Sequence, residues 1–238
     1  MYAIIPAAGL SSRMGKLDNG KTKVLTKLDS EASVLELTVK CMVDSQALRG
    51  LVIAARPEDC DEIEAAMRGL ISKLSSEIDL HIVAGGATRQ DSVWNGLLAV
   101  EGRANWVLVH DAARPFCSPS LVRRAAEAAK VHGACLVAVK SKSTLKRGLQ
   151  LDSGLVETVE TVDRTQIWEA QTPQVFEFRL LFDAHKSAQL CQFQATDESQ
   201  LVERLGRKVV IVEGEDLNFK ITTPHDLAYA RFLCGYAQ

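Results

Sequence analysis

The sequence predicts an α/β fold in which a mostly parallel sheet lies between layers of helices. Two observations predict it. Short apolar runs recur along the chain with helical patterns between them. These runs are nearly continuous in apolar residues rather than alternating, which is typical of strands buried on both faces of a parallel sheet. No repeat or linker divides the chain, so we expect residues 1–238 to form one domain.

The expected strands are the β-rich apolar runs. They fall at residues 3–5, 51–55, 80–86, 106–115, 135–139 and 208–214.

Helix signals stand between these runs. Apolar residues from Ile63 to Leu74 keep the three-to-four spacing of an amphipathic helix. Ser118 and Pro119 resemble an N-cap followed by a first-turn proline, and Gly133 stands where that helix would end. Thr223-Pro224 repeats the start signal before the last helix.

One polar segment, residues 141–165, interrupts the alternation. A turn signal at residues 152–154 predicts an extended hairpin that leaves the main sheet. A projecting polar hairpin is marginal on its own. We therefore expect it to act as an arm that packs on a second copy of the chain, giving a homodimer.

Composition excludes several classes of protein. The net charge of -2 predicts no nucleic-acid partner. No apolar run approaches the length of a membrane span, and the N-terminus lacks a signal-peptide pattern. The 6 cysteines form no CxxC pair, so we expect reduced, buried thiols in a cytoplasmic protein. The histidines other than His110 show no ligand spacing and are expected at or near the surface.

The first strand is followed by a loop suited to a nucleotide. Ala7, Ala8 and Gly9 let a ligand approach the backbone closely at the carboxyl end of a strand. Exposed N–H groups in such a loop bind phosphate oxygens. With Arg13 and Lys23, the loop has the fixed cations that phosphoryl or nucleotidyl transfer requires. A tight turn followed by solvated surface cations is the alternative.

Two further loops carry candidate site residues. Asp111 and Arg114 lie at the C-terminal end of the fourth run, where a carboxylate could hold Mg²⁺ or a ribose hydroxyl, or simply pair with the arginine. His110 is expected to fix this loop by hydrogen bonds rather than to act as a base. The segment 85–93, which contains Gly86, Arg89 and Ser92, lies at the end of the third run, where it could cap a helix or read a base edge.

Together, several motifs resemble the 2-C-methyl-D-erythritol 4-phosphate cytidylyltransferase family of the non-mevalonate isoprenoid pathway. The resemblance runs from residue 3 to about residue 230. The first motif is shared by many sugar nucleotidyltransferases, whereas the later ones are much more specific. The motifs are AIIPAAGLSSRMG (3–15), GGATRQDSV (85–93), HDAARPF (110–116), TVDRTQIWEAQTPQVF (161–176), TDE (196–198) and VEGEDLNFKITTPHDL (212–227).

The resemblance implies a Rossmann-like, Mg²⁺-dependent enzyme that transfers CMP from CTP to methylerythritol phosphate and releases pyrophosphate. It implies that Arg13 and Lys23 stabilise the transition state and the leaving pyrophosphate. Lys21 lies close enough to be a rival for Lys23. It also implies that Arg164 and Lys220 position the attacking phosphate.

The resemblance assigns the remaining site residues as well. Ala7, Ala8, Gly9, Gly86 and Ser92 match positions around cytosine and ribose. Asp111 matches the carboxylate near the ribose and the metal. Arg114, Thr144 and Thr196 match other substrate contacts. In the family the arm crosses to the other subunit, so Arg164 and Thr144 would serve the neighbour's site.

Other functions remain open at this point. Ribitol 5-phosphate is the nearest alternative acceptor, and a uridylyl- or guanylyltransferase is a weaker alternative. A non-catalytic nucleotide sensor could keep the same fold. The joint presence of Arg13, Lys23, Arg164 and Lys220 argues against a sensor, which needs no clamp for a substrate phosphate.

Overall fold

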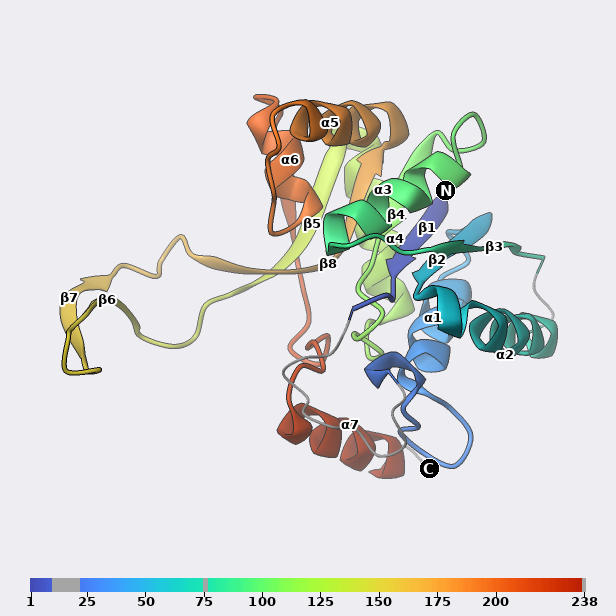
Figure 1. The fold of residues 1–238 in the computed structure, drawn as a ribbon, viewed down its shortest axis with the longest axis horizontal. Coiled ribbons are helices and arrows are strands. Elements are labelled where there is room, and N and C mark those ends of the chain that lie inside the picture. The colour runs from blue at the N-terminus through green and yellow to red at the C-terminus, as the bar shows by residue number, and fades with distance from the viewer. Residues whose placement is uncertain (10–21, 75–76, 237–238) are drawn as a thin grey trace.

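A computed structural model describes residues 1–9, 22–74 and 77–236 of the chain. A 7-stranded sheet in the order β3-β2-β1-β4-β8-β5-β9 forms its centre, and a separate 2-stranded sheet pairs β6 with β7. The α/β prediction is confirmed (Figure 1). The strands are β1 (Tyr2–Pro6), β2 (Gly50–Ala55), β3 (Asp79–Ala84), β4 (Trp106–Val109), β5 (Ala134–Lys140), β6 (Leu145–Gln150), β7 (Val156–Val162), β8 (Trp168–Glu177) and β9 (Val210–Glu213).

Helices cover both faces of the sheet. One core cluster packs α1, α2 and α4 against alternate strand residues such as Ala3 and Ile5. A second packs α3, α5 and α6 against the other face, which includes Tyr2 and Ile4. The helices are α1 (Val34–Asp44), α2 (Cys60–Lys73), α3 (Arg89–Ala99), α4 (Pro119–His132), α5 (Phe178–Leu190), α6 (Glu198–Arg204) and α7 (Pro224–Tyr236), with short 3-10 turns η3 (Lys23–Leu25) and η4 (Pro57–Asp59).

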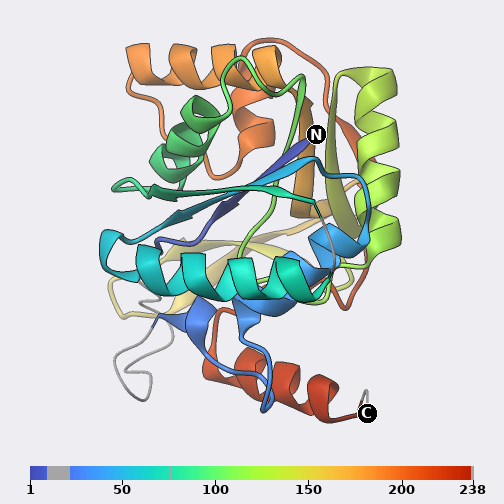
Figure 2. The same cartoon turned by 90° about the vertical axis from the view of Figure 1, so that its right-hand side faces the viewer.

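The predicted helix signals operate as expected. The Ser118 hydroxyl accepts a hydrogen bond from the Leu121 N–H at the start of α4, and Gly133 ends that helix with φ of 86°. Thr223 lies directly before α7, and its hydroxyl accepts from the Asp226 N–H. α7 lies below the layered body in both ribbon views (Figures 1 and 2).

Burial of the predicted strands depends on their place in the sheet. All six residues of β2 are buried, whereas β3 and β9 are only partly buried because they lie at the sheet edges. The run predicted over 106–115 is a strand only as far as Val109. Residues 110–115 form a loop, which leaves Asp111 at the carboxyl end of β4.

One central strand, β8, was not predicted. It runs antiparallel to both β4 and β5, and its sequence contains Gln171, Pro173 and Gln174. The pairing with β5 passes from Gln171 to Gln174 through a register shift at Leu136/Val137. This irregularity accommodates a proline that has no N–H to donate.

The hairpin predicted within residues 141–165 is present. β6 and β7 pair antiparallel and are joined by a turn in which Gly154 has φ of 83°. Figure 1 shows this arm reaching far from the body of the chain. Its surface includes exposed apolar side chains such as Leu149, Val156 and Val159.

Two expectations about single residue types need correction. The 6 cysteines are free, but Cys191 is exposed, and Cys60 and Cys234 are only partly buried. His185, expected near the surface, is fully buried in α5 and stacks on Trp94 with ring centroids 6.0 Å apart. No helix in the described ranges is long and apolar enough to cross a membrane.

His185 makes the fold sensitive to acid. Neither ring nitrogen has a hydrogen-bond partner among the described residues, and burial lowers the pKa of His185 to about 4. The ordinary pKa is about 6.5, so between these values the unfolded chain binds more protons than the folded chain. The free energy of unfolding therefore falls as the pH drops from about 6.5 to about 4.

We expect His185→Leu to raise the free energy of unfolding by about 1 kcal/mol at neutral pH, because an unpaired buried polar group is removed. The variant should also lose less stability than the wild type between pH 7 and pH 5. Urea unfolding at both pH values measures the two effects. His132→Leu is the matched control, because His132 is exposed. An equal acid loss in His185→Leu and wild type would contradict the assignment.

Candidate active site

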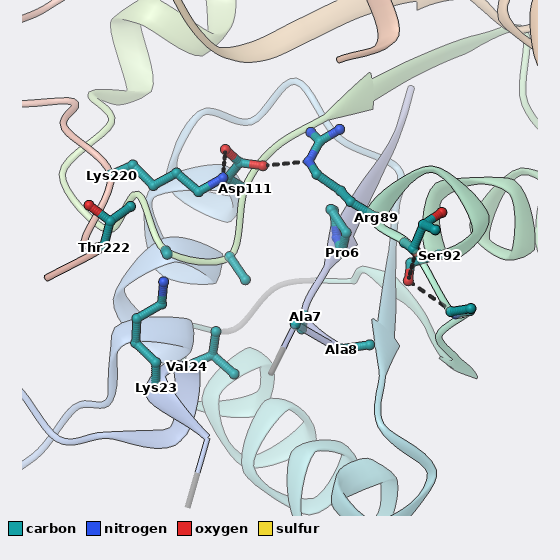
Figure 3. A pocket seen from close by; sticks show the side chains of 16 residues that line it. Pro6, Ala7, Ala8, Lys23, Val24, Arg89, Ser92, Asp111, Lys220 and Thr222 are labelled. Atoms are coloured by element: carbon teal, nitrogen blue, oxygen red, sulfur yellow. Dashed lines mark hydrogen bonds and ion pairs between the residues drawn. The ribbon is translucent and has the colours of Figure 1, made fainter. Parts of the chain in front are cut away.

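A pocket of about 340 Å³ opens at the carboxyl ends of β1 and β4. Its walls come from segments far apart in the chain: the first loop, η3, the loop before α3, the loop after β4 and the segment before α7. Figure 3 shows its side chains. The lining residues are Pro6, Ala7, Ala8, Gly9, Lys23, Val24, Gly86, Ala87, Thr88, Arg89, Ser92, Asp111, Ala112, Ala113, Lys220 and Thr222.

Small residues bring two of these loops together. The Ala7 N–H donates to the Ala54 carbonyl at 2.7 Å and the Gly85 N–H to the Ala55 carbonyl at 2.7 Å, so both loops are pinned to the end of β2. A Cβ on Gly85 would meet the Cβ of Ala8 at 2.3 Å. The packing of the Gly85 loop on Ala8 therefore depends on small residues on both sides, while the close approach of a ligand to Ala7, Ala8 and Gly9 stays a prediction.

Gly86 and Ser92 also line the pocket, as predicted, but the Ser92 hydroxyl is engaged within its own loop. It accepts from the Gly86 N–H at 3.1 Å and donates to the Thr88 carbonyl at 3.0 Å. A Cβ on Gly86 would meet the Cβ of Asp91 at 2.2 Å. Both residues shape the loop, and the helix cap expected in segment 85–93 is present, because the Thr88 hydroxyl accepts from the Asp91 N–H at the start of α3.

Lys23 enters the pocket from η3. Its ammonium donates to the Ile221 carbonyl at 2.6 Å, which places it beside Lys220 and Thr222 (Figure 3). The neighbouring Val24 is 6% exposed and belongs to the main core, so η3 is anchored. Arg13 and Lys21, the other cations predicted for this loop, lie outside the described residues.

Asp111 is surrounded by cations. Its carboxylate lies 3.0 Å from Arg89 Nε, 2.8 Å from Lys220 Nζ and 3.6 Å from Arg114 Nε. Burial opposes ionisation, but the charges of Arg89, Lys220 and Arg114 outweigh it and hold the pKa of Asp111 far below its ordinary value. The carboxylate is therefore ionised throughout the neutral range.

Arg89 connects Asp111 to a second buried carboxylate that sequence reasoning did not single out. Both oxygens of Glu198 lie 2.8 Å from Arg89 Nη1, and Glu198 is 1% exposed. Burial raises the pKa of the Glu198 carboxyl, and the Arg89 charge opposes that rise. The Arg89 guanidinium is thus bound by both Asp111 and Glu198. The arginine of the GGATR motif therefore forms buried ion pairs, a role beyond the predicted helix cap or base contact.

A smaller pocket of about 250 Å³ adjoins the first and shares Arg89, Asp111 and Lys220 with it. Arg114 and Thr196 line it, as expected for contacts to a second substrate. Arg114 Nη1 donates to the Asn218 carbonyl at 2.6 Å, which ties the loop after β4 to the segment that carries Lys220.

The arm residues predicted for the site do not reach either pocket within one chain. Arg164 and Thr144 are both exposed at the base of the arm, and neither lines a described pocket. Arg164 donates to the Lys142 carbonyl. Their predicted service to a neighbouring subunit stays a prediction.

The donor set for a metal is small. Among the described residues no group of three or more His, Cys, Asp and Glu side chains gathers around one point. Asp111 is the one carboxylate that lines the larger pocket in that part of the chain. Mg²⁺ typically takes one or two protein carboxylates and completes its shell with substrate phosphates and water, so a single ionised Asp111 fits that pattern.

Residues 1–235 match the family model for IspD, 2-C-methyl-D-erythritol 4-phosphate cytidylyltransferase. The chain belongs to this family. The resemblance read from the motifs is confirmed over almost the whole chain. The nucleotidyltransferase class, and with it the CTP-dependent cytidylyltransferase activity of the family, follows from this membership.

Individual relatives agree with the family match. A 2-C-methyl-D-erythritol 4-phosphate cytidylyltransferase of Bacillus cereus is 40% identical over 97% of this chain and 96% of its own. One of Microcystis aeruginosa is 38% identical over 98% of both chains. The crystal structure of the enzyme of that name from Thermus thermophilus superposes with a TM-score of 0.76 at 32% identity and covers 98% of both chains.

Proposed function

We propose that this chain transfers CMP from CTP to 2-C-methyl-D-erythritol 4-phosphate by in-line attack of the acceptor phosphate on the α-phosphorus of CTP. The observation that carries the mechanism is the pair of adjoining pockets that share Asp111, Arg89 and Lys220. The larger takes the nucleotide and the smaller takes the acceptor. The shared residues lie where the two pockets meet. In this proposal the α-phosphorus loses its bond to pyrophosphate there and gains a bond to the acceptor oxygen.

The nucleotide half is built for a triphosphate. Ala7, Ala8 and Gly9 offer backbone to the nucleotide, and Gly86 with Ser92 shapes the wall beside the base and ribose. Lys23 faces the phosphates, and the family resemblance assigns Arg13 to the same task. These cations stabilise the charge on the equatorial oxygens in the transition state and on the leaving pyrophosphate.

The acceptor half holds a phosphate monoester. Lys220, Arg114 and Thr196 line this side. An oxygen of the acceptor phosphate forms the new bond to the α-phosphorus while the bond to the bridging oxygen of the β-phosphate breaks, and pyrophosphate leaves with that electron pair. No strong general base is needed, because the second pKa of a phosphate monoester is about 6. Orientation and charge stabilisation account for the catalysis.

A divalent cation, in our proposal Mg²⁺, would be held by Asp111 together with the triphosphate. When bound, it supplies positive charge to the phosphates and orients them. Asp111 contributes by remaining ionised, and Arg89 contributes by holding one oxygen of that carboxylate in place at 3.0 Å.

The unpaired state of the 6 cysteines is consistent with action in a reducing compartment such as the cytoplasm.

The arm would complete the site of a second copy. It projects away from the layered body of the chain (Figure 1) and carries exposed apolar side chains that a partner would cover. We therefore place Arg164 and Thr144 beside the neighbour's acceptor pocket in a homodimer.

Mixing two inactive variants tests this arrangement. Lys23→Ala disables the site of its own subunit, and Arg164→Ala disables the site that its arm serves. A mixed dimer then has one site with both residues intact. After subunit exchange at equal amounts we expect about a quarter of wild-type activity, since about half of the dimers are mixed in a symmetric pair. If Arg164 serves its own chain, mixing restores nothing, and a fully active Arg164→Ala variant would remove it from the site.

The reaction itself is tested by pyrophosphate release with CTP and Mg²⁺ in the presence of methylerythritol 4-phosphate or ribitol 5-phosphate. We expect release with methylerythritol 4-phosphate alone. Release with ribitol 5-phosphate alone would keep the chemistry and replace the acceptor. Binding of CTP with no release for either acceptor would favour a nucleotide sensor. Arg13→Ala, run alongside, serves as the blank.

A further inference from the structure

Beside the smaller pocket, which Thr172 helps to line, a chain of hydrogen bonds joins strand β8 to the loop after β4. His110 is fully buried and Thr172 is 4% exposed. His110 Nε2 lies 3.1 Å from the Arg114 carbonyl, and His110 Nδ1 lies 3.1 Å from the Thr172 hydroxyl. The same hydroxyl accepts from the Asp111 N–H at 3.0 Å. The chain therefore begins and ends on Asp111 and Arg114.

The donors and acceptors in this chain have a single consistent order. A backbone carbonyl only accepts, so the proton bonded to it sits on Nε2 of His110. The Thr172 hydroxyl carries one proton, and His110 Nδ1 is the acceptor that lies within hydrogen-bond distance of it among the described residues. Nδ1 then accepts from the Thr172 O–H, while the Thr172 oxygen accepts from the Asp111 N–H. Every polar atom of His110 and of the Thr172 side chain is satisfied.

The backbone carbonyl of Thr172 extends this hydrogen-bond network toward the segment that carries Lys220. The Thr172 carbonyl accepts from Asn218 Nδ2 at 2.8 Å, and the Asn218 carbonyl accepts from Arg114 Nη1 at 2.6 Å. Lys220 follows two residues after Asn218. One polar network thus connects the loop after β4, strand β8 and the segment before α7, which supply most of the charges at the junction of the two pockets.

We propose that His110 and Thr172 form a positioning relay that holds Asp111 and Arg114 in their working orientation. Neither side chain touches the reacting atoms in this assignment. The relay acts through the loop 110–115, whose short turn also includes a hydrogen bond from the Arg114 N–H to the Asp111 carbonyl at 3.1 Å. This inference rests on the proposed function for its catalytic readout.

Thr172→Val removes the hydroxyl and keeps the branched shape, so it interrupts the relay at its centre. We expect kcat for pyrophosphate release to fall on the order of 10-fold, since displacement of a positioned group weakens catalysis steeply. The KM for CTP should change by less than about 3-fold, because most contacts to the nucleotide come from other loops. Thr172→Ser restores the hydroxyl and should return kcat to within about 2-fold of wild type.

Val39→Ala is the control for stability. Val39 is fully buried in α1 and makes no part of the relay, so this variant should lower the unfolding temperature while leaving kcat unchanged below it. Wild-type kcat in Thr172→Val, or equal impairment of Thr172→Ser and Thr172→Val, would overturn the relay. The second result would show that the β-branched packing matters rather than the hydroxyl.

A measurement of the ring nitrogens is independent of turnover. In ¹⁵N spectra at pH 7, with His110→Asn used to assign the signals, we expect His110 with its proton on Nε2 and an accepting Nδ1. The Nδ1 resonance should shift in Thr172→Val and return in Thr172→Ser. A proton on Nδ1 would overturn the relay even if the wild-type enzyme is active. Absence of wild-type turnover with both acceptors would instead count against the proposed function, and the spectra would still decide the relay.

Discussion

Lys23→Ala should lower kcat by roughly 10²–10³-fold, the scale for loss of one preorganised group that stabilises transition-state charge. The ammonium is held by the Ile221 carbonyl at 2.6 Å and faces the pocket assigned to the triphosphate. Charge grows on the phosphorus oxygens and on the leaving pyrophosphate as the reaction proceeds. The lost interaction therefore weakens the transition state more than the ground state, and the KM for CTP should change much less than kcat.

Steady-state pyrophosphate release measures this effect, and the chain offers two matched controls. Lys27 pairs with Glu36 on the surface and lies outside both pockets, so Lys27→Ala should retain wild-type kcat. Lys21→Ala separates the two candidate lysines of the first loop. A large loss in Lys21→Ala together with a small loss in Lys23→Ala would transfer the role to Lys21.

Regular burial made the centre of the fold predictable. Strands such as β1 and β2 are continuous apolar runs because they lie inside the sheet with helices on both faces. β8 has an equally central position, yet Gln171, Pro173 and Gln174 interrupt its pattern. These glutamines are buried because they bond specific partners: Gln171 donates to the Glu215 carbonyl and Gln174 to Asp197. Such pairing depends on the folded structure and is not encoded in local periodicity.

The candidate site, like the fold, could be predicted from the sequence only in part. The loops that contain Ala7, Lys23 and Asp111 could be found because glycine, alanine and charged residues follow apolar runs directly. The Arg89–Glu198 pair spans 109 positions of the sequence, and no local pattern links the two residues. The TDE motif (196–198) contributed to the family resemblance, but only Thr196 within it was assigned to the site. Its 1% exposure is what shows that it holds Arg89.

The structure of the arm could be predicted from the sequence, but its function could not. Its hairpin could be predicted from polar composition and the turn at residues 152–154, and the structure confirms that element. What the arm does depends on the surface of a second chain, which one copy does not contain. Arg164 and Thr144 therefore enter the site only through the dimer proposal.

Asp111→Asn should have an effect of similar size to Lys23→Ala, but through two opposing changes. The wild-type carboxylate neutralises part of the charge of Arg89, Lys220 and Arg114. Its removal leaves the junction of the pockets with one more unit of positive charge. At the same time it removes the carboxylate proposed to hold Mg²⁺. We expect kcat/KM for the Mg²⁺ complex of CTP to fall roughly 10²–10³-fold, because metal and phosphates lose their shared anchor.

Anion binding should move in the opposite direction. Inorganic triphosphate without metal should bind Asp111→Asn several-fold more tightly than wild type at low salt, since the added positive charge attracts a polyanion. Isothermal titration at two salt concentrations measures this change, and the difference should shrink at the higher salt. Asp44→Asn is the control, because Asp44 pairs with Lys40 at the surface and lies outside both pockets.

The two measurements together separate the possible roles of Asp111. Tighter binding of metal-free triphosphate with a large loss of Mg²⁺-dependent turnover supports a metal-holding carboxylate. Tighter triphosphate binding with near wild-type turnover would reduce Asp111 to a counter-charge for the three cations. Weaker triphosphate binding would mean that the cations lose their orientation without Asp111. In that case the remaining ion pair between Arg89 and Glu198 would not keep the cations of the two pockets in place. The main role of Asp111 would then be structural.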